Sequence, residues 1–247
     1  TDYINNCIQT IEESEVEIVN VGGIIKSLSL VNNAVSDAIA DIMSSKFGVG
    51  NSIFRVATPK KSIFVETVPF GCFKRSIFNE IGLFNIDQHR NEDLEFNHRI
   101  LKANKKILLN PNIISTYYVR DNYSDLIKQQ FHNGYIVTNR FSLDGLFHRV
   151  RHYVPLLWVS YIFISIFILF FSKSSSGFYY NTIIYSWILY GLVINLLSVY
   201  YSVIKKKINK IMYIPITIII IHGAYGIGSI FGVLHFFKNF FLKEKSQ

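Results

Sequence analysis

The segment RNEDLEFNHRI, residues 90–100, holds the side chains with the clearest chemical potential in this sequence. Asn91 is a favourable N-cap residue, so Glu92 and Asp93 are expected in the first turn of a helix, where the helix dipole stabilises negative charge. Helix capping alone would explain the pair. A carboxylate fixed at the start of a rigid helix could also act as a general base that removes a proton from a substrate. On the local pattern both interpretations stay open.

The apolar pattern around this segment predicts a layered α/β domain, because strands and helices alternate along the chain. Gly22-Gly23 is expected to end the first strand, and Gly82 to cap a short helix. Glu95 and Arg99 are four residues apart and are expected to form an ordinary surface pair. The expected strands cover residues 17–21, 63–68, 106–109 and 113–119, and the expected helices cover 31–43, 74–81, a segment from 92, and 123–141.

The second part of the chain is membrane-like in composition. Three stretches, residues 153–171, 178–204 and 211–237, contain no charged side chain. Each is long enough to cross a hydrocarbon core, which takes about 20 apolar residues. Residues 153–247 carry eight Lys and one acid, a net charge of +7 out of the total +8. The first part therefore has no excess of basic charge, which argues against a nucleic-acid-binding protein.

The positive charges also bear on topology, because loops rich in Lys and Arg stay in the cytosol. Arg149 and Arg151 precede the first stretch, and the second loop carries four Lys, whereas the first loop has only Lys173. Three crossings would leave the Lys residues of the C-terminal tail outside, against that rule. Pro215 and the run HGAYGIGSIFG would allow a re-entrant hairpin instead. Small residues recur every four positions at 224, 228 and 232, which favours one continuous helix and three spans.

Several motifs, in their order and spacing, resemble the second half of a family 2 glycosyltransferase, the inverting GT-A type. Within that family the chain resembles the membrane-anchored enzymes of bacterial exopolysaccharide and capsule assembly. The resemblance implies the C-terminal part of a Rossmann-like GT-A domain over residues 1–145, on the acceptor side and in the cytoplasm, and a multi-pass membrane domain over residues 146–247. The motifs are VGG (21–23), FGVGNSIFR (47–55), VETVPFGCFKRSIFNEIGLF (65–84), KKILLNP (105–111), YYVRD (117–121) and KQQFHNG (128–134).

The resemblance also implies roles for individual residues. Asp93 would be the general base that deprotonates an acceptor hydroxyl as it attacks a nucleotide sugar with inversion, and Glu92 would be a supporting acid. Gly71 would belong to the loop that lines the acceptor side of the pocket. Arg55 and Arg75 would face a diphosphate, although solvated surface positions are an open alternative for both. The implied partners are a nucleotide sugar, a lipid-linked or oligosaccharide acceptor, and membrane lipid.

Two departures from the family pattern shape the expected activity. Processive relatives carry Gln-x-x-Arg-Trp, whereas this chain has Gln129-x-x-His132-Asn133, which favours transfer of a single sugar. The family holds a divalent cation with an Asp-x-Asp motif, and the chain contains none. We therefore expect Mg²⁺ or Mn²⁺ in the full-length enzyme with ligands outside this chain. The donor half would be truncated or encoded separately, and the isolated chain inactive.

Other classes of protein remain as alternatives. The chain could be a non-catalytic membrane protein, either an inactive glycosyltransferase remnant or a subunit that docks a partner. A transporter would need polar groups inside the membrane stretches, and apart from hydroxyl groups these contain few, among them Asn195, His222 and His235. A glycosidase would need a second carboxylate across the sugar, and no candidate can be named.

Overall fold

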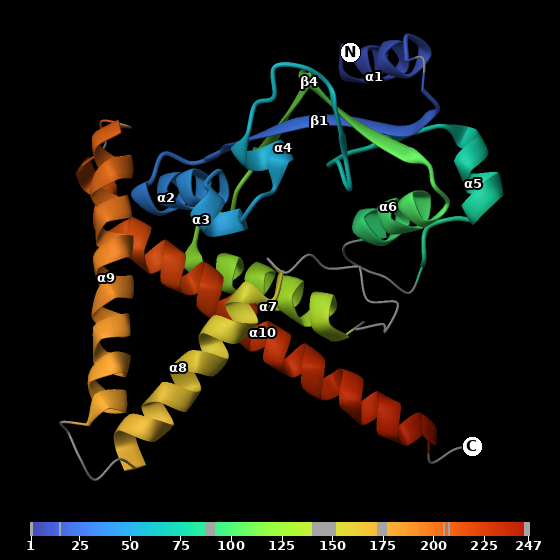
Figure 1. The fold of residues 1–247 in the computed structure, drawn as a ribbon. Coiled ribbons are helices and arrows are strands. Elements are labelled where there is room, and N and C mark those ends of the chain that lie inside the picture. The colour runs from blue at the N-terminus through green and yellow to red at the C-terminus, as the bar shows by residue number, and fades with distance from the viewer. Residues whose placement is uncertain are drawn as a thin grey trace. The chain divides into compact units, whose positions relative to one another are not determined.

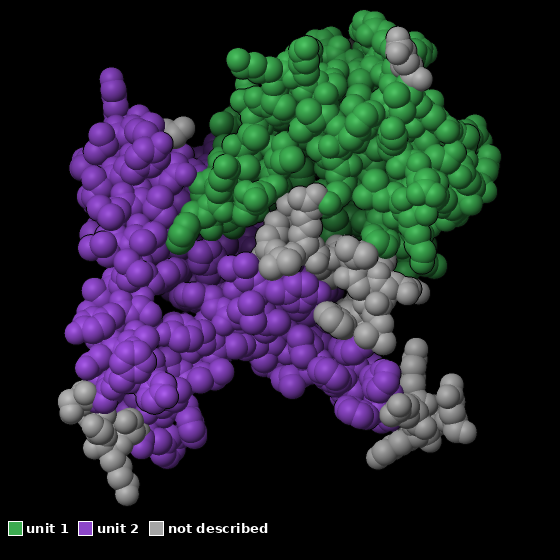
Figure 2. All heavy atoms as spheres, viewed as in Figure 1, with its two compact units in different colours: residues 1–28, 43–118 green, residues 29–42, 119–247 purple. Residues whose placement is uncertain are grey.

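The computed structural model describes residues 2–14, 16–86, 92–139, 152–171, 177–204, 206 and 208–244. The chain divides into two compact units, Thr1–Leu28 with Met43–Tyr118 and Ser29–Ile42 with Val119–Gln247 (Figure 2). The first unit holds the sheet, and the second is helical and holds the apolar helices. The boundary near residue 145 between catalytic and membrane domains stays a prediction.

The first unit is built on a four-stranded sheet with the strand order β2-β4-β1-β3 (Figure 1). The two central strands, β1 and β4, are parallel, and each outer strand is antiparallel to its neighbour. This mixed sheet with flanking helices confirms the predicted α/β fold. The strands are β1 (Ile18–Leu28), β2 (Ile63–Val65), β3 (Cys72–Phe73) and β4 (Lys106–Tyr118), and the helices are α1 (Asp2–Glu12), α3 (Lys46–Val49), α4 (Ile53–Val56), α5 (Arg75–Ile81) and α6 (Glu92–Lys102).

Both central strands are longer than the sequence predicts. The expectation that β1 ends at Gly22-Gly23 was wrong, because the strand continues to Leu28. A Cβ atom at Gly23 would lie 1.8 Å from the carbonyl oxygen of Ile113, so glycine permits close packing against β4 here. β4 is one strand rather than two. Pro111 lies between the two predicted strands. The pairing of β4 with β1 shifts at this point, between Gly22 and Ile24 of β1, and this irregularity lets the strand continue past Pro111.

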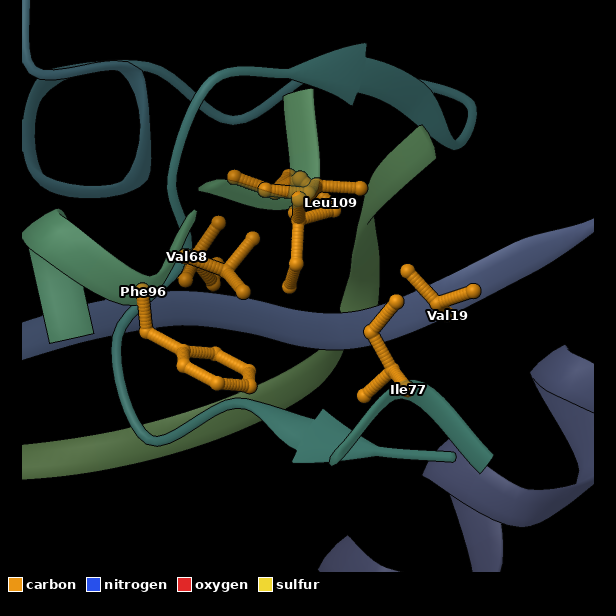
Figure 3. Packing of buried hydrophobic residues seen from close by; sticks show 8 residues of the cluster. Val19, Val68, Ile77, Phe96 and Leu109 are labelled. Atoms are coloured by element: carbon orange, nitrogen blue, oxygen red, sulfur yellow. The ribbon is translucent and has the colours of Figure 1, made fainter. Parts of the chain in front are cut away.

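Apolar side chains pack on both faces of the sheet. One cluster contains Val19, Val68, Ile77, Phe96 and Leu109, which point toward one another from β1, the segment after β2, α5, α6 and β4 (Figure 3). The opposite face packs against α1 through a second cluster that includes Cys7. α6 is therefore held in place by apolar contacts with the sheet and with α5.

Three local predictions can be compared directly with the structure. α5 ends at Ile81 and Gly82 follows with φ 83°, as the cap assignment requires. The helix predicted from residue 31 begins later: α2 spans Ala34–Met43, and the Asn33 side chain accepts a hydrogen bond of 2.7 Å from the backbone N–H of Ser36. An N-cap at this position explains the later start. Asn91, the predicted cap of α6, lies outside the described residues.

The second unit contains four long helices. α7 (Tyr123–Asn139) is followed by α8 (Val154–Phe171), α9 (Phe178–Ile204) and α10 (Tyr213–Glu244). The last three are long and apolar enough to cross a membrane. α10 is a single continuous helix, as the recurring small residues predict. The short helix η2 (Ile208–Lys210) joins α9 to α10.

Candidate active site

A cavity of about 880 Å³ lies in the first unit, beside the carboxyl-terminal halves of β1 and β4. The loop before β3, α4 and the start of α6 complete its wall. Sheets of this kind bind ligands at the carboxyl ends of parallel strands, so the position is chemically suggestive. The lining residues are Ile25, Phe54, Arg55, Pro69, Phe70, Gly71, Phe73, Phe84, Asn85, Ile86, Glu92, Asp93 and Tyr117.

Asp93 is half-buried in this wall, in the first turn of α6. Burial raises the pKa of its carboxyl group, and the negative charge of Glu92 raises that pKa further. Backbone N–H groups oppose the shift, and Asp93 Oδ1 accepts a hydrogen bond of 2.8 Å from the N–H of Leu94. The pKa of Asp93 is therefore raised overall, whereas the helix dipole alone would lower it. A carboxylate in this environment is a stronger base than an exposed one.

Arg55, on α4, is the cation among the described residues that line the cavity. Its guanidinium lies 4.9 Å from the ring centroid of Tyr117, and Nη1 donates to Ser27 Oγ at 3.3 Å. Burial lowers the pKa of the group. Among the residues that the structure describes, Arg55 has no carboxylate within ion-pair distance. A half-buried guanidinium without an anionic partner is well suited to bind an anionic ligand.

The loop that carries Gly71 approaches β1 very closely. A Cβ atom at Gly71 would lie 2.3 Å from Asn20 Oδ1, so only glycine allows the backbone to pack this closely against β1. The preceding residue, Phe70, has φ 50°, which is a strained conformation for a bulky side chain. The hydroxyl of Tyr3 donates to the Phe70 carbonyl oxygen at 2.7 Å and holds it there.

A buried chain of polar side chains lies beneath this loop, and sequence reasoning missed it. Asn20 Nδ2 donates to Asn97 Oδ1 at 2.7 Å, and Asn97 Nδ2 donates to Thr67 Oγ1 at 2.9 Å. Both asparagines are fully buried. Asn97 is four residues after Asp93, so it belongs to the same face of α6. The sequence feature that could have indicated this buried polar contact is an asparagine between the apolar residues Phe96 and Ile100 of an amphipathic helix.

Arg99 has a structural role that goes beyond the predicted surface pair. Its side chain is 25% exposed, and its Nε lies 2.8 Å from Glu95 Oε1. It also donates to the carbonyl oxygens of Ile81 at 2.6 Å and Leu83 at 2.8 Å. The predicted pair with Glu95 is therefore confirmed, and Arg99 in addition binds two backbone acceptors at the C-terminal end of α5 and just after it. Arg99 thereby ties the cavity wall near Phe84 to α6.

The structure brings four of the seven predicted site residues together: Asp93, Glu92, Gly71 and Arg55 line one cavity. Arg75 is exposed at the first position of α5 and is not among the lining residues. Gln129 and His132 belong to α7 in the other unit. His132 is exposed, with Nδ1 2.8 Å from the carbonyl oxygen of Lys128.

The described residues contain no group of three or more His, Cys, Asp or Glu side chains that could hold a metal ion. Among the described residues that line the cavity, the carboxylates are Glu92 and Asp93, which are neighbours in the sequence. These two residues do not fit a metal site by themselves.

The chain has similarity to known proteins over most of its length. Residues 1–202 match the model of a family described as glycosyl transferase family group 2. A relative from Methanococcus voltae, dolichyl N-acetyl-alpha-D-glucosaminyl phosphate 3-beta-D-2,3-diacetamido-2,3-dideoxy-beta-D-glucuronosyltransferase, is 33% identical over 162 residues. The match covers 64% of this chain and 46% of the relative, so the chain spans about half the length of that protein. The chain belongs to glycosyl transferase family group 2.

Proposed function

We propose that this chain forms the acceptor-side part of a hexosyl-type glycosyltransferase of cell-surface polysaccharide synthesis. The enzyme transfers a sugar from a nucleotide-sugar donor to a lipid-linked or saccharide acceptor. Family membership supports the class of reaction. The name of the Methanococcus voltae relative, which includes a dolichyl phosphate sugar, supports a lipid-linked acceptor. The observation that carries the proposal is the shared cavity of Asp93, whose pKa is raised, and Arg55, which has no anionic partner among the described residues.

The proposed chemistry is a single displacement. Asp93 accepts the proton of an acceptor hydroxyl, whose oxygen forms a bond to the anomeric carbon. The bond from that carbon to the nucleoside diphosphate breaks at the same time, and the configuration inverts. General-base assistance of this kind contributes about 10²- to 10⁴-fold to the rate. Arg55 stabilises the charge of the departing diphosphate, and Glu92 raises the basicity of Asp93.

The remaining site residues have secondary roles in this proposal. Gly71 lets the loop backbone approach the acceptor, and Arg75 contributes positive charge near the site. Gln129 and His132 contact an acceptor that receives one sugar. A divalent cation, Mg²⁺ or Mn²⁺, is held by residues of the full-length enzyme outside this chain. The catalytic part lies in the cytoplasm, where nucleotide sugars are present, and the apolar helices anchor it in the cell membrane as a multi-pass protein.

The direct test is Asp93→Asn in the full-length enzyme. Transfer is expected to fall by about 10²-fold or more, because the amide cannot accept the proton. Nucleotide-sugar binding, measured by calorimetry, is expected to stay near normal, because the base acts on the acceptor. Asn79→Asp, at an exposed position of α5, controls for altered surface charge. Near-normal transfer by the Asp93→Asn enzyme would return the acidic pair to a helix-capping role.

A further inference from the structure

α10 packs along α7 over most of the length of α7, and the two helices run in the same direction. At the first turn of α7, the Tyr123 hydroxyl donates to the Tyr213 carbonyl oxygen at 3.1 Å. At the last turn, Thr138 Oγ1 donates to the Ser229 carbonyl oxygen at 2.8 Å. Contacts that advance together along both helices define a parallel pair.

Small residues let the two backbones approach closely. A Cβ atom at Gly228 would lie 2.0 Å from the Phe131 carbonyl oxygen, and one at Gly134 would lie 2.0 Å from the Tyr225 carbonyl oxygen. Gly232 meets Tyr135 and Thr138 in the same way. The recurring small residues of α10 therefore serve contact with α7, and the pair is fixed in register.

α7 is too polar to lie in the hydrocarbon core. The side chain of Lys128 is 70% exposed and that of Asp125 is 48% exposed, and His132 is exposed. The midpoint of the apolar window Tyr213–Leu242 falls at residues 227–228, and Gly228 packs on Phe131. If α10 stood upright across the bilayer, Lys128 and His132 would lie near its centre, where charged and polar groups are costly.

Chain topology excludes the alternative that α7 itself crosses the membrane. If α7 crossed in one direction, α8, α9 and α10 would cross in alternating directions after it. α10 would then run antiparallel to α7, whereas the contacts show that the two are parallel. α7 therefore lies outside the hydrocarbon core. The part of α10 that packs against α7 must lie at a similar depth.

The start of α8 gives a second, independent measure of depth. α8 has 18 residues, about 27 Å of helix, so its full length is needed to cross a core of about 30 Å. Its first turn must then lie at the bilayer surface. A Cβ atom at Gly226 would lie 2.3 Å from the Pro155 carbonyl oxygen, and His152 Nδ1 lies 3.2 Å from the Tyr225 hydroxyl. The middle of α10 is therefore at the depth where α8 begins.

We propose that α10 lies along the bilayer surface at which α8 begins and does not cross the membrane. The pair has two chemically different sides: α7 presents its charged residues to water, and α10 exposes apolar side chains on a face that acyl chains can cover. The exposed apolar residues of α10 recur at helical spacing and include Ile216, Ile219, Ile227, Leu234, Phe237 and Phe241. The pair, rather than α10 alone, thus combines the polar and the apolar face of an interfacial element.

The charge distribution agrees with this arrangement. A third crossing would place the C-terminal lysines, Lys238, Lys243 and Lys245, on the opposite side from the lysine-rich loop at residues 205–210. With α8 and α9 as the crossing helices, all these lysines lie on one side, which satisfies the positive-inside rule. The proposal departs from the three crossings that length and composition alone favour.

Site-directed spin labelling in the full chain, reconstituted in phosphatidylethanolamine and phosphatidylglycerol vesicles, measures the depth of each residue. Single cysteines are placed at Ile216, Ile227, Leu234 and Phe241 after Cys7→Ala and Cys72→Ala. The four labels are expected at one shallow depth, as judged by relative collision with oxygen and with a water-soluble nickel chelate. A label at Ile164, an exposed position in the middle of α8, is the control for the bilayer centre.

Two patterns would overturn the proposal. A depth that is greatest at Ile227 and smaller at both ends would mean an upright crossing or a hairpin, and a steady increase from Ile216 to Phe241 would mean an oblique crossing. A second measurement does not depend on labels in α10. Ser246→Cys is expected to be protected from an impermeant thiol reagent until the cells are lysed, while Ser175→Cys reacts in intact cells. Labelling of Ser246→Cys in intact cells would contradict the proposal.

Discussion

The folded structure disfavours the ionised form of Asp93, because burial and the neighbouring Glu92 both raise the pKa of its carboxyl group. A group with a folded-state pKa above its unfolded value makes the protein less stable as pH rises between those two values. The unfolded value for Asp is about 3.9. Above the folded pKa the ionised side chain therefore destabilises the protein. Such stored destabilisation is typical of side chains kept for chemistry.

Asp93→Asn is accordingly expected to raise the melting temperature at neutral pH, because the amide removes a half-buried charge and keeps the shape. The gain should disappear below the unfolded pKa, where the native side chain is also neutral. Thermal unfolding of the purified full chain at several pH values measures this. The matched control is Asp125→Asn on α7, where a hydrogen bond from Asn122 holds the carboxyl pKa below its usual value. That variant should show no gain, and a lower melting temperature for Asp93→Asn at neutral pH would contradict the burial argument.

At the scale of the element, α6 is positioned by contacts on three sides. Phe96 packs in a ring cluster in which its centroid lies 5.2 Å from that of Phe73 and 4.6 Å from that of Phe84. Arg99 binds the carbonyl oxygens after α5, and Asn97 joins the helix to β1 through Asn20. These contacts fix the helix turn that carries Asp93 relative to the cavity.

Asn97→Leu is expected to lower the free energy of unfolding by about 1–3 kcal/mol, because buried amide and hydroxyl partners lose their hydrogen bonds. It should also lower kcat more than it changes acceptor KM, since the base is displaced while the cavity persists. Denaturant unfolding and steady-state transfer by the full-length enzyme measure the two effects. Asn79→Leu, at an exposed position of α5, should change stability by no more than about 0.5 kcal/mol. Equal effects of the two substitutions would remove the positioning role.

Local signals in the sequence predicted the elements that depend on nearby residues. The helix from Glu92 and the Gly82 cap follow from cap chemistry and dipole effects within a few positions. The length of β1 and the Asn20–Asn97 bond depend on partners that are distant in the chain, 77 residues apart for the asparagine pair. Periodicity cannot identify such partners. The cavity was therefore predicted in part: its carboxylates, Arg55 and Gly71 were named, while Tyr117 and the buried asparagines were not.

At the scale of the whole molecule, a buried ion pair fixes α2 to the connection between α9 and α10. The side chain of Lys210 is 4% exposed, and its Nζ lies 2.6 Å from Asp41 Oδ2 and 3.9 Å from Asp37 Oδ2. α2 carries both carboxylates one helix turn apart. The segment Ser29–Ile42 is thereby attached to the other helices of the second unit.

Lys210→Met is expected to destabilise the protein by about 3–5 kcal/mol, because it removes the buried lysine charge that pairs with Asp41. Combining it with Asp37→Asn and Asp41→Asn should restore most of the loss, because the carboxylates that faced the lysine are then neutral. Thermal unfolding in detergent, followed by circular dichroism, measures both. A triple variant that is as unstable as the single one would show that packing of the lysine stem, rather than charge, holds the contact.

Asp93, with a pKa set by its surroundings, is proposed to accept the proton in the transfer reaction. The most direct measurement is the acid limb of kcat/KM against pH for the full-length enzyme and for its Glu92→Gln variant. We expect this acid limb to lie above the usual pKa range of aspartate, because burial raises the pKa of Asp93. In the variant this limb should move to lower pH, because the charge that raises the pKa of Asp93 is removed. An acid limb that stays in place when Glu92 is neutralised would contradict the assignment of Asp93 as the base.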